Sequence, residues 1–130
     1  MTNDELIKAA AEVRLQAYAP YSNYQVGAAI ECSDGTVFTG CNVENSSYGL
    51  SMCAERVAVF KAISVGRKDF RRIAVIADSH SAVRPCGACR QVLSELFPAE
   101  AEVIMSSTRG KTEVATVSAL LPYPFDRSYL

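Results

Sequence analysis

The sequence lacks a long apolar run and a block of basic residues. No stretch reaches the roughly 18 apolar residues of a membrane-spanning helix, and the first residues show no basic region followed by an apolar one. Export and membrane insertion are therefore not supported, and we expect a soluble cytoplasmic protein without a membrane partner. The net charge is −1 and the basic residues are scattered. Because nucleic-acid binding requires basic side chains that neutralise phosphates, a nucleic-acid polymer is not an expected partner.

No segment combines low hydropathy with high charge, which excludes a long disordered tail. Apolar residues make up 49% of the chain and charged residues 21%, as in ordinary globular proteins. A chain of this length buries roughly two thirds of the surface that its unfolded form exposes, so it needs no disulfides. No linker, internal repeat or low-complexity stretch divides it. We expect a single domain over residues 1–130.

Helical and strand-like patterns alternate along the chain. Thr2 and Glu5 form a capping-box pattern before apolar residues at helical spacing, which predicts a helix that continues until Pro20 closes the run. Residues 25–32 and 36–43 flank an Asp-Gly turn and predict an antiparallel hairpin. The later patterns predict a helix over 53–66, a strand over 72–77, a helix over 86–97 and strands over 102–106 and 112–117. The order αββαβαββ predicts an α/β fold, a single three-layer domain with a mixed central β-sheet flanked by helices.

The five cysteines are an odd number, and in a reducing compartment thiols more often serve metals or chemistry than disulfides. Cys86 and Cys89 lie three positions apart at a predicted helix start, so both thiols can turn toward one point. Cys53 begins another predicted helix. Helix N-termini favour the thiolates that a metal requires. Three thiolates around Zn²⁺ leave one position open, which is the arrangement of a catalytic zinc site.

An acidic residue and several arginines near these cysteines also fit a catalytic zinc site. Glu55 follows Cys53 by two residues, close enough to exchange protons with water at the open position. Zinc with three thiolates has a net charge of −1, which opposes the acidification of water unless cations offset it. Arg56, Arg84 and Arg90 are candidates for this offset by their proximity in sequence.

Cys-Ala-Glu at 53–55 with Pro-Cys-Gly-Ala-Cys at 85–89 resembles the signature of the zinc nucleoside deaminases. Cys53 stands where histidine is the commoner first ligand, and the only histidine, His80, lies outside the motif. From YAPYSNYQVGAA through GCNVENSSYGLSMCAERVAVFKA and PCGACRQVLSE to LLPYPF, the chain resembles the short homotetrameric cytidine deaminases with three cysteine ligands. The resemblance implies a zinc-dependent hydrolase of pyrimidine salvage that converts cytidine and 2′-deoxycytidine to uridine and 2′-deoxyuridine, with release of ammonia.

The resemblance also implies roles for residues outside the two motifs. Active sites at the subunit interfaces of a homotetramer would let side chains reach a site of another chain. Independently of the resemblance, Asn42 and Glu44 lie where a predicted strand meets a loop, and their side chains can form hydrogen bonds with sugar hydroxyls. The implied roles are a hydrogen bond from Arg56 to the ligand thiolates, ribose binding by Asn42 and Glu44, stacking of Phe125 on the base, contact of Tyr24 with the sugar and pyrimidine, and a reach of Tyr48 and Phe125 into a neighbouring site.

Simpler interpretations of these residues stay open at this point. The three cysteines could be buried small side chains, or ligands of a structural zinc completed by His80 or Cys41. Glu55 could merely stabilise a helix dipole, and Phe125 could be a core or interface aromatic. Turn hydrogen bonds could account for Asn42, Glu44 and Tyr48, while Cys32 and Cys41 fit strand cores and receive no function.

Three other functions compete with cytidine deamination. One is deamination of another aminopyrimidine nucleoside such as blasticidin S, against which Arg56 and the Asn-Val-Glu-Asn segment argue. A polynucleotide or transfer-RNA deaminase would need a basic track and stacking aromatics, which the sequence does not show. A structural zinc module would need four protein ligands and would not depend on Glu55.

Overall fold

A five-stranded mixed sheet forms the centre of the computed structural model, which describes residues 1–130. The strands lie in the order β2-β1-β3-β4-β5. β3 and β4 are parallel, and every other neighbouring pair is antiparallel. The strands are β1 (Val26–Cys32), β2 (Val37–Cys41), β3 (Phe70–Ala77), β4 (Glu102–Ser107) and β5 (Thr112–Thr116). The predicted hairpin and the mixed sheet are thus confirmed.

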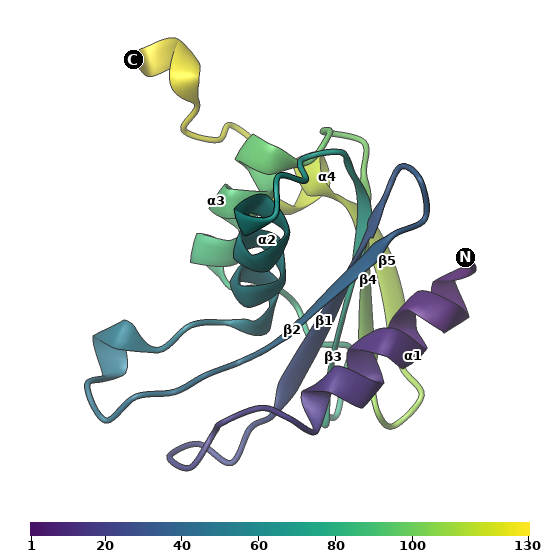
Figure 1. Ribbon diagram of the computed structural model, residues 1–130, viewed down its shortest axis with the longest axis vertical. Helices are drawn as coiled ribbons and strands as arrows, with labels where there is room; N and C mark the ends of the chain where they lie inside the picture. Colours follow the sequence, from purple (N-terminus) through teal and green to yellow (C-terminus); the bar gives the residue numbers. More distant parts are fainter.

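Helices cover both faces of this sheet (Figure 1). Helix α1 (Asn3–Arg14) lies on one face, and α2 (Ala54–Ser64) and α3 (Gly87–Leu96) lie on the other, with the short α4 (Val117–Leu120) beside α3. Two single-turn 3₁₀ helices, η1 (Tyr48–Leu50) and η2 (Arg127–Tyr129), complete the elements. No helix has both the length and the apolar character needed to cross a membrane. The predicted three-layer α/β fold is confirmed.

Alternating strand residues divide the core between the two faces of the sheet. Ala28 and Ile30 of β1 pack in the larger apolar cluster with α2 and α3, whereas Ala29 between them packs with Leu6 and Ala10 of α1. This alternation follows from the two-residue period of a strand. Both layers of helices are therefore held by the same strands.

Helix α1 begins as predicted and ends earlier than predicted. The side chain of Thr2 accepts a hydrogen bond from the backbone N–H of Glu5, and the Glu5 carboxylate accepts one from the backbone N–H of Thr2, which completes the capping box. The helix ends at Arg14 rather than continuing to Pro20. Beyond it the chain tightens into turns, and the N–H of Tyr18 donates to the carbonyl of Asn42, so pairing with a distant segment replaces the helical pattern.

Smaller differences occur where side chains cap elements locally. The predicted strand over 112–117 ends at Thr116, because the Thr116 hydroxyl accepts a hydrogen bond from Ala119 N–H and starts α4. The second strand of the first hairpin ends at Cys41 instead of residue 43, and β3 begins at Phe70, two residues early. These shifts leave the predicted order of the long elements unchanged.

The two helices of the larger layer begin at the same place. β2 and β3 are both antiparallel to β1, so they run in the same direction and α2 is the crossover between them. α3 is the crossover between the parallel neighbours β3 and β4. α2 follows the carboxyl end of β2 and α3 follows the carboxyl end of β3, so both helix N-termini lie at the carboxyl end of these strands. Ligand crevices of α/β sheets form at this end.

Candidate metal centre and active site

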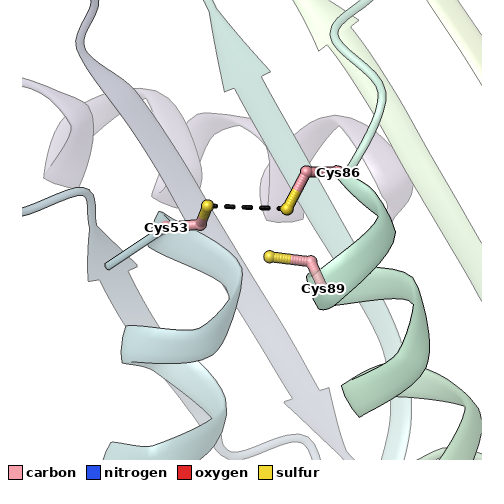
Figure 2. A group of neighbouring side chains, drawn as sticks. All are labelled: Cys53, Cys86 and Cys89. Carbon is pink, nitrogen blue, oxygen red and sulfur yellow. Dashed lines mark hydrogen bonds between the residues drawn. The ribbon is translucent and has the colours of Figure 1, made fainter. Parts of the chain in front are cut away.

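Three of the five cysteines meet where α2 and α3 begin (Figure 2). Cys53 is the N-cap residue of α2, Cys86 is the N-cap residue of α3, and Cys89 lies in the first turn of α3. The Sγ atoms of Cys53 and Cys86 are 3.7 Å apart, and all three Sγ atoms lie within 4.8 Å of one another. The structure therefore brings together the three residues that the spacing singled out.

The geometry and chemistry of this cluster fit one zinc ion. Tetrahedral zinc with Zn–S bonds of about 2.3 Å separates its sulfur ligands by about 3.8 Å. Neither Cys53 nor Cys86 uses its side chain to cap its helix, so both thiols are free to bind a metal. His80 and Cys41 are not part of the cluster. With three protein ligands, the cluster has the composition of a catalytic site rather than that of a four-ligand structural site.

Two of the three thiols differ in how readily they lose a proton. Hydrogen bonding from the Cys89 thiol, together with the Arg56 guanidinium, lowers the pKa of Cys53 to about 5. The pKa of Cys89 is raised, because its thiol supplies that hydrogen bond and is buried. A thiolate is thus available at Cys53 near neutral pH, and a bound dication favours the loss of the remaining protons.

One arginine contacts the thiols directly. Arg56 Nη2 donates to Cys53 Sγ at 3.4 Å. The other two arginines considered from the sequence have different partners: Arg84 pairs with Glu113 at 3.2 Å, and Arg90 donates to the carbonyls of Pro85 and Leu120. Arg56 is therefore the cation placed to offset the negative charge of the thiolates.

Glu55 lies in the first turn of α2, immediately beside this cluster. Glu55 is only 5% exposed to solvent. Burial raises the pKa of Glu55 to about 7, and the neighbouring Cys53 adds to the rise. A carboxyl group with a pKa near 7 can both accept and donate a proton at neutral pH, which is the requirement for a proton shuttle.

A cavity of about 260 Å³ opens onto the cluster. Its wall combines apolar side chains with a few polar groups, as small-molecule sites do. A larger cavity of about 590 Å³ lies near the start of β3 and contains none of the three clustered cysteines. The smaller cavity is lined by Tyr24, Val26, Asn42, Glu44, Ser51, Met52, Cys53, Ala54, Glu55, Val83, Arg84 and Cys86.

Asn42 and Glu44 line this cavity and also hold the loop that precedes β1. Asn42 Oδ1 accepts from the N–H of Val26 at 2.8 Å, and its Nδ2 donates to the carbonyl of Tyr24 at 2.8 Å. Glu44 Oε1 accepts from the backbone N–H groups of Tyr21 and Ser22, and Glu44 Oε2 accepts from the Ser22 hydroxyl. We call these contacts the loop clamp; they place Tyr24 at the cavity wall.

Comparison with known proteins agrees with this geometry. The model of a family described as "cytidine and deoxycytidylate deaminase zinc-binding region" matches residues 1–106, which include all three clustered cysteines and Glu55. The chain belongs to the cytidine and deoxycytidylate deaminase family. Since the matched region of the family binds zinc, zinc is the metal cofactor that the cysteine cluster fits.

Similar members of this deaminase family extend the match over nearly the whole chain. The chain is 53% identical over 125 residues to a cytidine deaminase of Halalkalibacterium halodurans, with 96% of this chain and 95% of the relative covered. It is 45% identical over 130 residues to a cytidine deaminase of Sporosarcina psychrophila, with 100% and 96% covered. The crystal structure of a cytidine deaminase from Burkholderia pseudomallei superimposes with a TM-score of 0.94 at 50% identity, covering 96% of this chain and 100% of the other.

Tyr48 and Phe125, the two aromatic residues for which the family resemblance implies a reach into a neighbouring site, lie outside the cavity. Tyr48 is 75% exposed on η1 and lines a neighbouring hollow together with Glu44 and Ser51. Phe125 is 59% exposed on the segment after α4, where its ring stacks on Tyr129 with centroids 5.2 Å apart. Figure 1 shows that the loop carrying η1 and the C-terminal segment both extend away from the sheet. Neither residue joins the site of its own chain.

Several residues of the deaminase cavity were not predicted from the sequence. Val26 and Val83 form part of its apolar wall, and Ser22, which lies outside the cavity, engages Glu44 of that wall. Val26 begins β1 and Val83 lies in the loop before α3, and an apolar residue at either place carries no signal that it faces a cavity rather than the core. Ser22 could have been found only from the fold, since 22 residues separate it from its partner.

Proposed function

We propose that the chain catalyses the hydrolytic deamination of cytidine and 2′-deoxycytidine to uridine and 2′-deoxyuridine, with Cys53, Cys86 and Cys89 holding zinc. The position of Glu55 carries this proposal, because a buried carboxyl group with a pKa of about 7 lines the same small cavity as Cys53 and Cys86. The similarity to cytidine deaminases over nearly the full chain supports the choice of substrate.

Glu55 moves the protons of the proposed reaction. Zinc, when bound, supplies Lewis-acid activation of water. The Glu55 carboxylate accepts a proton from the attacking water and delivers it to N3 of the pyrimidine while oxygen adds to C4. It then passes the second proton to the departing amine, so that cytidine and water yield uridine and ammonia. Because its pKa lies near 7, Glu55 exchanges protons in both directions without a large energetic cost.

Substrate recognition is assigned to the loop clamp and to Tyr24. Asn42 and Glu44 each retain further hydrogen-bonding capacity beyond the clamp, since carboxylate and amide oxygens accept more than one bond. We assign this capacity to the ribose hydroxyls, and we place the Tyr24 ring beside the sugar and pyrimidine. A nucleoside whose sugar uses this remaining capacity is preferred over the free base, which makes no such hydrogen bonds.

We further propose a homotetramer, in which Tyr48 and Phe125 complete the site of a neighbouring chain. This assignment is supported by the exposure of both rings on segments that extend from the body of the chain. An isolated chain would leave these aromatic surfaces in water at a cost in free energy. Because the metal ligands must remain reduced thiols, we also propose that the protein acts in the cytoplasm.

The decisive experiment compares the wild type with Glu55→Gln. Each protein is incubated with cytidine while uridine and ammonia are quantified, and zinc per chain is measured by elemental analysis. We expect turnover in the wild type and its near-complete loss in a variant that retains zinc, because Gln keeps the shape of Glu55 and cannot transfer protons. If both zinc-loaded proteins are inactive toward cytidine and toward other aminopyrimidine nucleosides such as blasticidin S, a structural zinc site replaces the proposal.

A further inference from the structure

Gly40 of β2 lies directly against the first turn of α2. A Cβ atom added at Gly40 would be 2.4 Å from the backbone N of Ala58 and 2.7 Å from the carbonyl oxygen of Ala54. Both are backbone atoms of the helix, so no side chain can rotate away to make room. Only glycine, which has no Cβ atom, therefore allows α2 to lie this close to β2.

Small residues surround this contact on both the helix and the sheet. Ala54, Ala58 and Ala62 are spaced one turn apart on α2 and are fully buried. On the sheet, Gly40 pairs with Ala28 of β1, which is also fully buried. A helix normally packs on its neighbours through side chains, whereas α2 approaches β2 at backbone distance. The depth of α2 is thus set by the absence of side-chain volume.

The first turn of α2 carries the chemistry. Ala54 lies between Cys53 and Glu55, so any displacement of this turn moves both residues together. The partners of Cys53 are on a different element, α3. Ordinary van der Waals contact begins at 3.4 Å, so a Cβ atom at Gly40 would require α2 to retreat by about 1 Å. A displacement of that size in a catalytic arrangement can cost on the order of 100-fold in rate.

We propose that Gly40 is a positioning residue: it fixes α2 at the depth where the first turn of this helix meets the two cysteines of α3. The inference rests on the proposed zinc-dependent function and adds to it a residue that touches neither metal nor substrate. Since α2 and α3 are separate crossovers, the distance between their N-termini is not fixed by local structure. Gly40 determines it through the packing of α2 on β2.

Gly27→Ala is a matched control for Gly40→Ala. A Cβ atom at Gly27 would be 2.0 Å from the carbonyl oxygen of Ala10 in α1, on the opposite face of the sheet. Gly40→Ala forces α2 away from the sheet and Gly27→Ala forces α1 away from it. Of these two helices, only α2 carries a proposed metal ligand. The measurements are the thermal midpoint, the zinc dissociation constant from competition with a chelator, and the absorption spectrum of the Co²⁺-substituted protein.

We expect both variants to lower the thermal midpoint and only Gly40→Ala to weaken zinc binding, by about 10- to 100-fold. Its Co²⁺ spectrum should depart from that of the wild type, and kcat for cytidine should fall more than KM rises. Destabilisation alone leaves the affinity of the folded chain unchanged, so equal zinc constants for the two folded variants would overturn the proposal.

A milder variant covers the case in which Gly40→Ala does not fold. Ala58→Ser adds one atom to a fully buried residue of α2 whose backbone meets Gly40. We expect it to weaken zinc binding in the same direction, and an unchanged constant would also overturn the proposal. The zinc constants require no substrate. Absence of cytidine turnover in the wild type would therefore contradict the proposed function while leaving this comparison intact.

Discussion

The guanidinium of Arg56 is the positive charge in hydrogen-bonding contact with the cysteine cluster. We predict that Arg56→Gln raises the zinc dissociation constant by about 10- to 100-fold, because the variant removes the charge that offsets the thiolates. Chelator competition measures this change. Arg84→Gln is the matched control, since Arg84 is an exposed arginine near the same cavity whose partner is Glu113. Equal constants for Arg56→Gln and the wild type would refute the assigned role.

At the same scale, the residues that are close in sequence were the ones that could be predicted. Cys53 and Glu55 are two positions apart, and Cys86 and Cys89 are three apart, so helical geometry alone relates the members of each pair. The loop clamp was not foreseen, because Glu44 and Asn42 hold backbone groups 16 to 23 residues away. Contacts of that kind depend on the fold, and the sequence pattern carries no local signal for them.

Among the elements, β1 and β3 are joined by an ion pair that makes stability depend on pH. Glu31 is 2% exposed, and Arg72 Nε donates to its carboxylate at 2.8 Å across the two strands. This hydrogen bond lowers the pKa of Glu31 in the folded protein. The stabilisation is therefore complete above the unfolded pKa of about 4.3 and is lost as the pH falls through the lower folded pKa.

We predict that Glu31→Gln costs about 1–3 kcal/mol of unfolding free energy at pH 7, and less as the pH falls below 4. Urea unfolding at several pH values measures the difference from the wild type. Glu12→Gln, a change on the exposed face of α1, should have little effect at any of these pH values. A cost for Glu31→Gln that does not depend on pH would show that the charge of Glu31 is not what stabilises the pair.

The cysteine cluster that fits zinc spans two other elements, α2 and α3, where these helices begin. We predict that removal of zinc with a chelator lowers the thermal midpoint, because a ligand present at 100 times its dissociation constant stabilises the folded state by about 2.7 kcal/mol. Differential scanning calorimetry with and without chelator measures the shift. In Cys53→Ser the same chelator should have little further effect, and a shift as large as that of the wild type would place the metal elsewhere.

The long elements could be predicted because each has its own apolar period, which the tertiary structure preserves. Several ends of elements could not be predicted. α1 stops at Arg14 because Tyr18 pairs with Asn42, and α4 starts where Thr116 turns its hydroxyl to Ala119. Two backbone hydrogen bonds of Tyr18, with Asn42 and Glu44, outweigh the continuing pattern at the end of α1, and one side-chain hydrogen bond does so at Thr116. The contact of Gly40 with α2 was also invisible in sequence, since a glycine in a strand can mark several different features.

At the scale of the whole molecule, the proposed homotetramer would complete each site with an aromatic ring from a neighbouring chain. The cavity is lined by Cys53, Cys86, Glu55 and the proposed sugar contacts, whereas the Phe125 ring lies exposed on the C-terminal segment. Stacking on an aromatic ring contributes about 1–3 kcal/mol for a nucleobase. We therefore predict that Phe125→Ala raises KM for cytidine by roughly 5- to 150-fold, with a smaller effect on kcat. Steady-state kinetics test this, and unaltered KM would remove the ring from the site.

Mixing two defective variants distinguishes a shared site from one built within each chain. Glu55→Gln supplies an intact Phe125 without a proton shuttle, and Phe125→Ala supplies an intact Glu55 without the stacking ring. If the ring reaches a neighbouring chain, mixed assemblies contain sites in which both residues are intact. Co-refolded mixtures should then turn over cytidine at low concentration faster than the average of the separate variants. If Phe125 served its own chain, every site would keep one defect, and the mixture would only match that average.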